Sequence, residues 1–416
     1  MTRAPCPATD ADLLAGVERY GTAAYVYDLQ ALSSRYAELT NAFGEDFAVR
    51  YAVKANPNSE VLRHLHHLGA LFDASSIGEV RRAIAIGAAP EAVSFTGPGK
   101  RRAEVEEAVD LGIGAIVLES LAQAHQAQDH AARLGRVQSV MLRISPSTSP
   151  RGFGARMTGR ATQFGVDEEN AADALAAIVT LPNLRLEGLH FYSGSNSLDA
   201  EAIAQNISIC GQLAIDLGAT LPGPMDRLIF GSGFGVPYHD GQQPLQIAAL
   251  RESIKAAIAP LARNPATRSA RLELELGRWL VAPCGVLLTS VLTRKSGRGS
   301  EICILDAGFN AHLAACGMMG SALRRNWPIR NVTAPDRSPE TVTLAGPLCT
   351  SIDLLARDLV IASPLEGDVL AVDMSGAYGF TASPAGFISQ PTTLELIWDG
   401  TRLFDATNSG AEHIRR

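Results

Sequence analysis

The sequence has little of several features that mark specialised classes of protein. Aromatic residues make up only 6% of the 416 residues, and the six cysteines are scattered without metal-ligand spacing, so no metal site is expected. No apolar stretch approaches the roughly 20 residues that a membrane span requires, and the first residues lack the apolar core of a secretory signal. Acidic residues outnumber basic ones 43 to 36, which argues against a nucleic-acid-binding surface. We expect a globular protein of the cytoplasm with reduced thiols.

A recurring pattern of a short β-branched run, a turn and an Ala-rich amphipathic stretch is present in the first two thirds of the chain. The runs that read as strands cover residues 47–53, 70–73, 93–96, 115–118, 139–144, 184–191, 227–230 and 272–276. Eight strands alternating with helices predict an α/β protein whose residues 30–280 form a (β/α)8 TIM barrel. An open doubly wound sheet fits less well, because the Gly-rich segment follows the seventh strand rather than the first.

The pattern changes after residue 280 to short strands without long helices. These strands are predicted over residues 285–295, 301–308, 340–346, 368–374 and 393–400. They predict a second domain, a β-sandwich or β-barrel, formed by residues 281–416. We assign residues 1–29 to the same domain, because the run 23–28 precedes the barrel and can pair with the later strands.

Polar residues follow several of the predicted barrel strands, at the end where barrels carry their chemistry. Lys54 follows the first strand, where partial desolvation would lower its pKa and favour a Schiff base, although a strand-end lysine can also simply reach solvent. The glycine-rich run 231–235 follows the seventh strand. Its backbone amides could approach a phosphate, or the run could be an ordinary turn.

Glu275 lies at the end of the eighth predicted strand, and Arg278 follows three residues later. A carboxylate there could hold a protonated pyridine nitrogen, or the two residues could form a surface ion pair. In the second domain, Cys349 lies beside a Gly-Pro turn and Tyr378 lies between glycines. Taken alone, a free cysteine is more often an inert core thiol, and an aromatic residue between glycines is more often a turn anchor.

The order of nine motifs gives these signals a common meaning. The motifs are YAVKAN, FDASSIGEV, FTGPGK, QFGV, GLHFYSGSN, GSGFGVPY, ELGR, AGPLCTSID and SGAYG. From about residue 20 to residue 400 the chain resembles the fold-type III pyridoxal-phosphate decarboxylases, the group that holds diaminopimelate, ornithine and arginine decarboxylases. The resemblance implies an alanine racemase-like barrel and pyridoxal 5′-phosphate as the cofactor.

The resemblance also implies a role for individual residues. Lys54 would carry the cofactor covalently, and Cys349 would be the general acid that protonates the α-carbon. Because Cys349 would reach in from the partner subunit, a homodimer with a shared active site is implied. The implied cofactor-binding residues are Lys54, Asp73, Tyr192, Ser195, Gly231, Ser232, Gly233, Glu275, Arg278 and Tyr378.

Several departures from the family pattern concern the far end of the substrate. Ala314, Ala315 and Met318 stand where diaminopimelate decarboxylases have an Arg-Pro pair and a Tyr, and Thr350 stands where they have a Glu. Losing the partners of a buried charge costs roughly several kcal/mol, so diaminopimelate, ornithine and lysine are poor candidates.

A further departure concerns the cofactor ring. Tyr192 stands where the family usually has a stacked His. Tyr can still stack but cannot carry a positive charge. We expect His190, two residues earlier, to point to the opposite face of its strand and not to substitute.

The variant motifs resemble a subgroup from natural-product and envelope-biosynthesis pathways. Some of its members decarboxylate a glutamyl or methylaspartyl group held as a thioester on a carrier protein. An uncharged distal pocket suits a thioester, and Arg324 and Arg325 could meet the phosphopantetheine phosphate or the acidic surface of the carrier. Exposed arginines are more often merely solvated.

Three other readings remain open. One is the decarboxylation of a free amino acid such as diaminopimelate, ornithine or lysine. Another is an amino-acid racemase, which shares the barrel and the lysine, although Cys349 within GPLCTSID favours decarboxylation. A non-catalytic homologue is the third, and the presence of Lys54, Glu275 and Arg278 argues against it.

Overall fold

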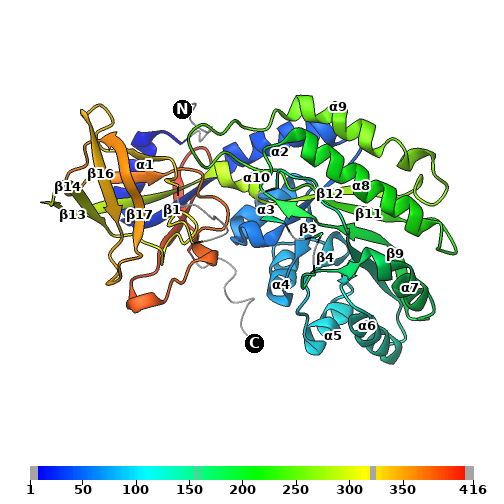
Figure 1. The fold of residues 1–416 in the computed structure, drawn as a ribbon. Helices are drawn as coiled ribbons and strands as arrows, with labels where there is room; N and C mark the ends of the chain where they lie inside the picture. The colour runs from blue at the N-terminus through cyan, green and yellow to red at the C-terminus, as the bar shows by residue number, and fades with distance from the viewer. Residues whose placement is uncertain (1–7, 154, 157, 160, 319–324, 408–416) are drawn as a thin grey trace.

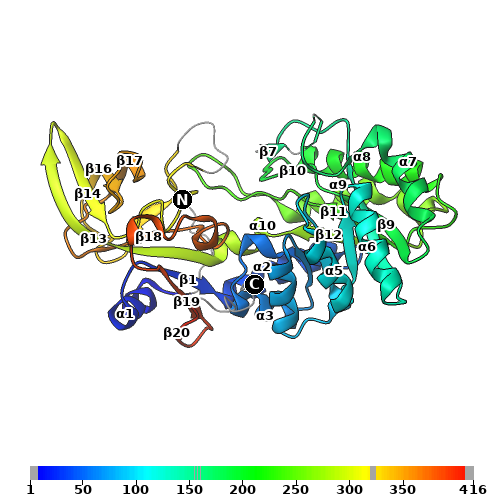
Figure 2. The same ribbon diagram turned by 90° about the horizontal axis from the view of Figure 1, so that it is seen from below.

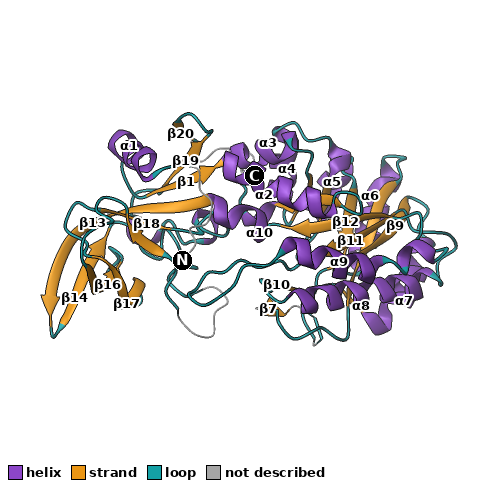
Figure 3. Ribbon diagram, turned by 90° about the horizontal axis from the view of Figure 1, so that it is seen from above, coloured by secondary structure: helices purple, strands orange, loops and turns teal. Residues whose placement is uncertain are grey.

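The computed structural model describes residues 8–153, 155–156, 158–159, 161–318 and 325–407. Two domains lie side by side, a barrel surrounded by helices and a second domain built mainly of strands (Figures 1 and 3). Among the described residues, no helix combines the length and the apolar character needed to cross a membrane.

The first domain is a closed barrel of eight parallel strands, as the sequence predicts. The strand order is β5-β4-β3-β2-β12-β11-β9-β6, and pairing between β5 and β6 closes the barrel. Most residues of these strands are buried on both faces of the sheet, including charged ones such as Arg50 and Glu273. Their bounds are β2 (Ala48–Ala52), β3 (Leu71–Ala74), β4 (Val93–Phe95), β5 (Ala115–Leu118), β6 (Gln138–Ser145), β9 (Leu184–Phe191), β11 (Arg227–Gly231) and β12 (Arg271–Leu276).

Helices cover the outside of this barrel (Figure 1). Several begin at a side-chain cap, which satisfies backbone N–H groups of the first turn. Asp28 accepts from the N–H groups of Gln30 and Ala31, and Ser76 and Ser120 cap the helices that follow β3 and β5. The helices of this domain are α2 (Leu29–Phe43), α3 (Ser59–His67), α4 (Ile77–Ala85), α5 (Arg102–Leu111), α6 (Leu121–Arg133), α7 (Glu168–Val179), α8 (Ala200–Gly218), α9 (Ile247–Ile258) and α10 (Arg278–Val281).

Short elements complete the connections between these strands and helices. The 3-10 turn η1 (Val53–Ala55) follows β2 directly and carries Lys54. The short strand β10 (Gly194–Ser195) pairs with β7 (Ala155–Arg156), and β8 (Val166–Asp167) extends the sheet beside β6. The other 3-10 turns are η2 (Pro90–Ala92), η3 (Leu261–Arg263), η4 (Ala282–Cys284), η5 (Phe380–Ala382) and η6 (Phe387–Ser389).

The second domain is a mixed sheet of nine described strands, so the expected second β domain is confirmed. The path β17-β16-β14-β13-β1-β19-β20 forms the sheet, and β18 pairs with both β13 and β15. The strands are β1 (Ala24–Asp28), β13 (Gly285–Gly297), β14 (Ser300–Leu305), β15 (Ile329–Asn331), β16 (Pro339–Ala345), β17 (Leu354–Ala362), β18 (Val369–Val372), β19 (Leu394–Trp398) and β20 (Leu403–Asp405). Helix α1 (Asp10–Tyr20) packs beside β20 (Figure 3).

Two crossings of the chain join the domains. The early strand β1 pairs antiparallel with β13 and parallel with β19, so residues 24–28 lie inside the second sheet. After η4 the chain leaves the barrel as the long strand β13, which runs from the α10 end of the barrel into the second domain (Figure 2). The second sheet is thereby anchored beside the loops that follow the barrel strands.

Candidate active site

A lysine and two carboxylates meet at the carboxyl ends of β2, β3 and β12. Lys54 Nζ lies 3.3 Å from Glu275 Oε1 and 3.9 Å from Asp73 Oδ2. Both carboxylates are almost fully buried, whereas 34% of the lysine side chain is exposed. The amine therefore stands at the mouth of the barrel, with its counterions below it.

The charges of these three groups determine one another. Burial by itself would lower the pKa of Lys54, but attraction to Glu275 and Asp73 raises the pKa above its usual value. The expectation of a lowered lysine pKa is therefore wrong, because the sequence did not reveal how close the two carboxylates lie.

The two carboxylates have opposite pKa shifts. Burial would raise the pKa of Glu275, yet the charge of Lys54 and a hydrogen bond from His190 hold the pKa well below the usual value. Burial, together with the charge of Glu275, raises the pKa of Asp73. Glu275 is thus the anion that the site keeps ionised most firmly.

His190 belongs to this group, which corrects a second expectation. Its Nε2 lies 2.7 Å from Glu275 Oε2, and both side chains are buried. Tyr192 faces the same interior, since Lys54 Nζ lies 5.5 Å from the centre of its ring. Residues two apart on a strand share a face, so the expected opposite orientation of His190 was wrong.

An arginine lies between two tyrosines at the start of α10. Arg278 Nη1 donates to the Tyr238 hydroxyl at 2.8 Å, and its Cζ lies 4.5 Å from the centre of the Tyr378 ring. The backbone N–H of Tyr378 donates to the carbonyl of Ala55 at 2.8 Å. A loop of the second domain thus rests on the turn that carries Lys54.

The glycine-rich run after β11 is packed so tightly that side chains would not fit. A Cβ on Gly231 would lie 2.3 Å from the Tyr192 ring, and one on Gly233, where φ is +66°, would lie 2.4 Å from the Phe153 ring. The Ser232 N–H donates to the Glu275 carbonyl at 2.9 Å. The run therefore needs glycine for close approach of the backbone.

The structure also brings Ser195 to this run. The N–H of Ser197, two residues after Ser195, donates to the Gly233 carbonyl at 2.9 Å. Ser195 itself lies in β10, the short strand that leads into this contact. The two segments expected at the phosphate end are therefore neighbours.

An ion pair to which the sequence assigned no role has its arginine near Tyr192. Arg143 Nη1 pairs with Glu119 at 3.2 Å, and the Arg143 Cζ lies 5.9 Å from the centre of the Tyr192 ring. Glu119 also accepts from the N–H groups of Gly97 and Gly165, each at 2.8 Å. Their positions at strand ends were the only sequence signal available for Arg143 and Glu119.

The predicted substrate-side residues lie in the second domain, and their turns bond within that domain. Cys349 is exposed in the turn between β16 and β17, where the adjacent Thr350 N–H donates to the Leu348 carbonyl at 2.7 Å. Ala314 is partly buried and Met318 is 37% exposed in the segment after β14. Arg324 lies outside the described residues.

The groups at the barrel mouth fit pyridoxal 5′-phosphate. The lysine can hold an aldehyde carbon, and the ionised Glu275 can hold a ring nitrogen in its protonated form. Arg278 Nε is buried without a hydrogen-bond partner among the described residues, as is Asp73 Oδ2. An unpaired guanidinium donor beside a glycine run suits a phosphate.

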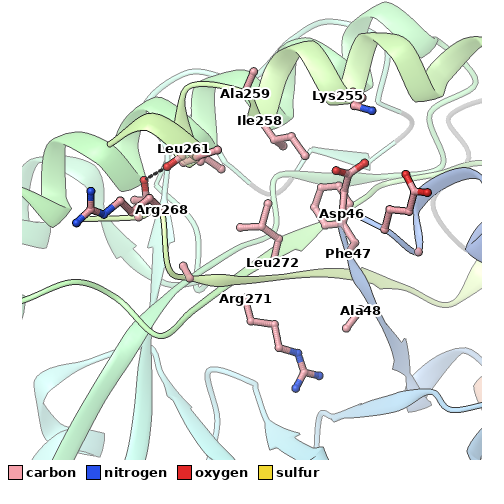
Figure 4. Close-up of a pocket in the computed structure, with 15 residues that line it drawn as sticks. Asp46, Phe47, Ala48, Lys255, Ile258, Ala259, Leu261, Arg268, Arg271 and Leu272 are labelled. Carbon is pink, nitrogen blue, oxygen red and sulfur yellow. Dashed lines mark hydrogen bonds between the residues drawn. The ribbon is translucent and has the colours of Figure 1, made fainter. Parts of the chain in front are cut away.

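Within the part of the chain that the structure describes, neither a metal-binding cluster nor a separate cleft offers an alternative to this cofactor site. The described residues include no group of three or more His, Cys, Asp or Glu side chains that could hold a metal ion. A cleft of about 570 Å³ lies beside Phe47, Leu272 and the end of α9 (Figure 4), but it opens at the amino-terminal ends of β2 and β12. Barrel enzymes carry their chemistry at the other end.

A barrel with a lysine just after its first strand, a buried Glu near the end of its eighth strand and an arginine that suits an anion fits the class of pyridoxal-binding barrel enzymes. Comparison with known proteins makes the assignment specific. The family model described as "Pyridoxal-dependent decarboxylase, pyridoxal binding domain" matches residues 29–282. The chain belongs to this family and is a pyridoxal-phosphate-dependent amino-acid decarboxylase.

Individual relatives cover nearly the whole chain. The L-glutamyl-(BtrI acyl-carrier protein) decarboxylase of Niallia circulans is 30% identical over 391 residues, which is 93% of this chain and 91% of the relative. The diaminopimelate decarboxylase of Pseudomonas aeruginosa is 33% identical and covers 92% of this chain and 89% of the relative. Among solved structures, diaminopimelate decarboxylase from Helicobacter pylori in complex with L-lysine has a TM-score of 0.84 at 27% identity, covering 95% of this chain and 96% of that chain.

Proposed function

We propose that the enzyme removes the α-carboxylate from an acidic aminoacyl group, glutamyl or methylaspartyl, that is tethered to a carrier protein in natural-product biosynthesis. The observation that carries this proposal is the lack of ionisable side chains at the substrate-side positions, Ala314, Met318 and Thr350. A diamino acid would leave a charged distal group without a partner there. A thioester presents no charge at that end.

The relatives include enzymes named for both substrate classes, carrier-bound aminoacyl groups and free amino acids. One relative is named for a carrier-bound glutamyl group, and several relatives of similar identity are named diaminopimelate decarboxylases. The decarboxylation of a free amino acid is therefore the second candidate. Its support is the overall similarity rather than any side chain at the substrate-side positions.

Each group at the barrel mouth has a task in this reaction. Lys54 would hold the cofactor through its amine. The bound cofactor would supply the conjugated ring that takes up the electron pair left when the bond to the carboxylate carbon breaks. Glu275 would keep a proton on the ring nitrogen, and Tyr192 would be available to pack against the ring.

We assign the phosphate of the cofactor to the end of the site formed by Arg278 and the glycine run. Arg278 supplies the charge, and Tyr378 and Ser195 lie within the loops around it. The glycine run from Gly231 to Gly233 supplies backbone close enough to approach an anion. These residues would hold the phosphate end of the cofactor in place during the reaction.

Completion of the reaction needs a proton at the α-carbon after carbon dioxide leaves. We assign the donor to the Cys349 thiol of a second subunit, so that a homodimer shares its sites. Cys349 is exposed, and the apolar side chains of Ile352, Phe387 and Ile388 are 42–53% exposed on the same domain. An exposed thiol and exposed apolar side chains on one domain suit burial against a second copy.

Mass spectrometry of reaction products tests the substrate assignment. One set of substrates is glutamate and methylaspartate as thioesters on a carrier protein, and the other is the same acids free, with ornithine, lysine and diaminopimelate. Loss of carbon dioxide from the tethered set alone is expected. Turnover of a free diamino acid would show instead that other residues recognise the distal end.

A further inference from the structure

Four side chains form a continuous column that passes through both domains at the phosphate end of the site. Trp327, from the segment before β15, stacks on Tyr238 of the barrel, with ring centres 4.3 Å apart and planes at 27°. The Tyr238 hydroxyl accepts from Arg278 Nη1 at 2.8 Å, and Arg278 lies over the Tyr378 ring at 4.5 Å. The second domain thus supplies both ends of the column, and the barrel supplies its middle.

Trp327 is fixed in this column by its own neighbours. It is 6% exposed, and the His312 ring meets it edge-on with centres 4.7 Å apart. The preceding residue, Asn326, bonds through its side chain to both backbone groups of Arg357 on β17, at 2.6 and 3.0 Å. The tryptophan is therefore held on the second sheet before it meets the tyrosine.

The contact between Tyr238 and Trp327 limits where the tyrosine hydroxyl can lie. Tyr238 is buried, and the ring of the neighbouring His239 bonds to the Asn326 carbonyl at 3.2 Å. A stacked ring held in this way keeps its hydroxyl in one place. The hydroxyl in turn fixes one end of the Arg278 guanidinium.

The directions of the remaining N–H donors of Arg278 follow from these two contacts. An arginine has a flexible stem and five N–H donors in a planar fork, so fixing one nitrogen and one face fixes the fork. Its Nε is buried without a hydrogen-bond partner among the described residues. We propose that Tyr238 and Trp327 are positioning residues, which hold the Arg278 guanidinium ready for the cofactor phosphate.

This inference rests on the assignment of Arg278 to the phosphate. It goes beyond that assignment because it gives a role to two residues that do not bind the cofactor themselves. Tyr238 contacts Arg278, and Trp327 contacts Tyr238. A hydrogen bond to a charged group contributes roughly tenfold or more to an affinity. Loss of the Tyr238 hydroxyl should therefore weaken phosphate binding by about tenfold.

The test compares two cofactors that differ only in the phosphate. The dissociation constants of pyridoxal 5′-phosphate and pyridoxal are measured on the apoenzyme from the absorbance of the lysine-bound form. Tyr238→Phe and Trp327→Ala should each weaken binding of the phosphorylated cofactor about tenfold and leave pyridoxal unchanged. Trp327→Phe, which keeps a stacking ring, should restore most of the affinity.

Matched controls come from outside the column. Tyr36→Phe alters a buried tyrosine of α2, and Trp398→Ala alters a tryptophan of β19, so neither should change either constant. Unchanged phosphate affinity in Tyr238→Phe overturns the proposal. Equal weakening of both cofactors also overturns it, because that result reports general loss of packing.

Arg278→Met separates this inference from the assignment beneath it. If Arg278→Met weakens both cofactors equally, the phosphate assignment itself fails. If it weakens only the phosphorylated cofactor while Tyr238→Phe has no effect, the positioning roles alone fail. Tyr238→Phe keeps the ring and its stacking, so the test does not depend on whether Trp327→Ala folds.

Discussion

His190 Nε2 and Glu275 Oε2 lie 2.7 Å apart inside the barrel, where each side chain is 1% exposed. An ionised carboxylate has no proton to give, so the imidazole is the donor. The other carboxylate oxygen of Glu275 faces Lys54 at 3.3 Å. His190 therefore contacts the Glu275 oxygen that Lys54 does not contact, and it stabilises the ionised form of Glu275. That form is the one needed to pair with a protonated ring nitrogen of the cofactor.

Replacing His190 by Leu should reduce kcat by about 10- to 100-fold, because the hydrogen bond that stabilises the ionised carboxylate is lost. His190 contributes to the low pKa of Glu275, so its loss raises that pKa. The acid limb of the pH profile of kcat should then move to higher pH. His190→Gln, which keeps a donor, should retain most of the rate, and an unmoved acid limb in His190→Leu would contradict this role.

Replacing Lys54 by Ala should abolish turnover and the absorbance of the lysine-bound cofactor. The change also leaves Asp73 and Glu275 buried without their cation. In the variant, protonating one of these carboxylates removes its buried, unpaired charge. The free energy of unfolding lost relative to the wild type should therefore become smaller as the pH falls from 8 towards 5. Thermal unfolding of both apoenzymes across this range measures the effect, and a pH-independent difference would argue against it.

The barrel was predictable because its strands are short apolar runs separated by amphipathic helices. Strand β17 was missed because Arg357 and Asp358 interrupt its apolar pattern, and Asp358 has a φ of +47°, where the strand becomes irregular. A local irregularity of this kind breaks the alternation on which a strand prediction depends.

The site was predictable only in part, since motif order can name residues but not their distances. Lys54 and Glu275 lie 3.3 Å apart, and Arg278 contacts Tyr378, the residue of the last motif. The stacking of Tyr238 on Trp327 was not foreseen, because the two residues come from different domains and no periodicity links them. The pKa of Lys54 was misjudged for the same reason, as it depends on Glu275 and Asp73 from the two neighbouring strands.

A charged pair within the barrel gives a prediction about stability alone. Arg50 Nε lies 2.6 Å from Glu273 Oε2, and both side chains are fully buried. Glu273→Gln should lower the free energy of unfolding by roughly 3–5 kcal/mol, because a buried guanidinium loses its counterion. Denaturant unfolding measures this change, with Glu301→Gln, which alters the partly exposed ion pair with Arg294, as a control that should lower the free energy of unfolding far less.

Mixing two inactive variants tests whether subunits share their sites. Lys54→Ala lacks the cofactor lysine, and Cys349→Ala lacks the proposed proton donor, so each variant alone should form little of the amine product that is protonated at the α-carbon, which is the activity to be followed. If Cys349 acts in the site of the partner subunit, a mixed dimer holds one site with both residues intact. Random reassortment should then restore about a quarter of wild-type activity.

The product ratio of Cys349→Ala, measured alone, is a control for the mixing experiment. Cys349→Ala alone should still bind the cofactor and lose carbon dioxide, but it should protonate the α-carbon slowly and yield a changed product ratio, because the thiol no longer supplies the proton. Cys303→Ala, which alters a buried cysteine of β14, should leave that ratio unchanged. No recovery on mixing, with an altered ratio in Cys349→Ala, would place the thiol in the site of its own subunit.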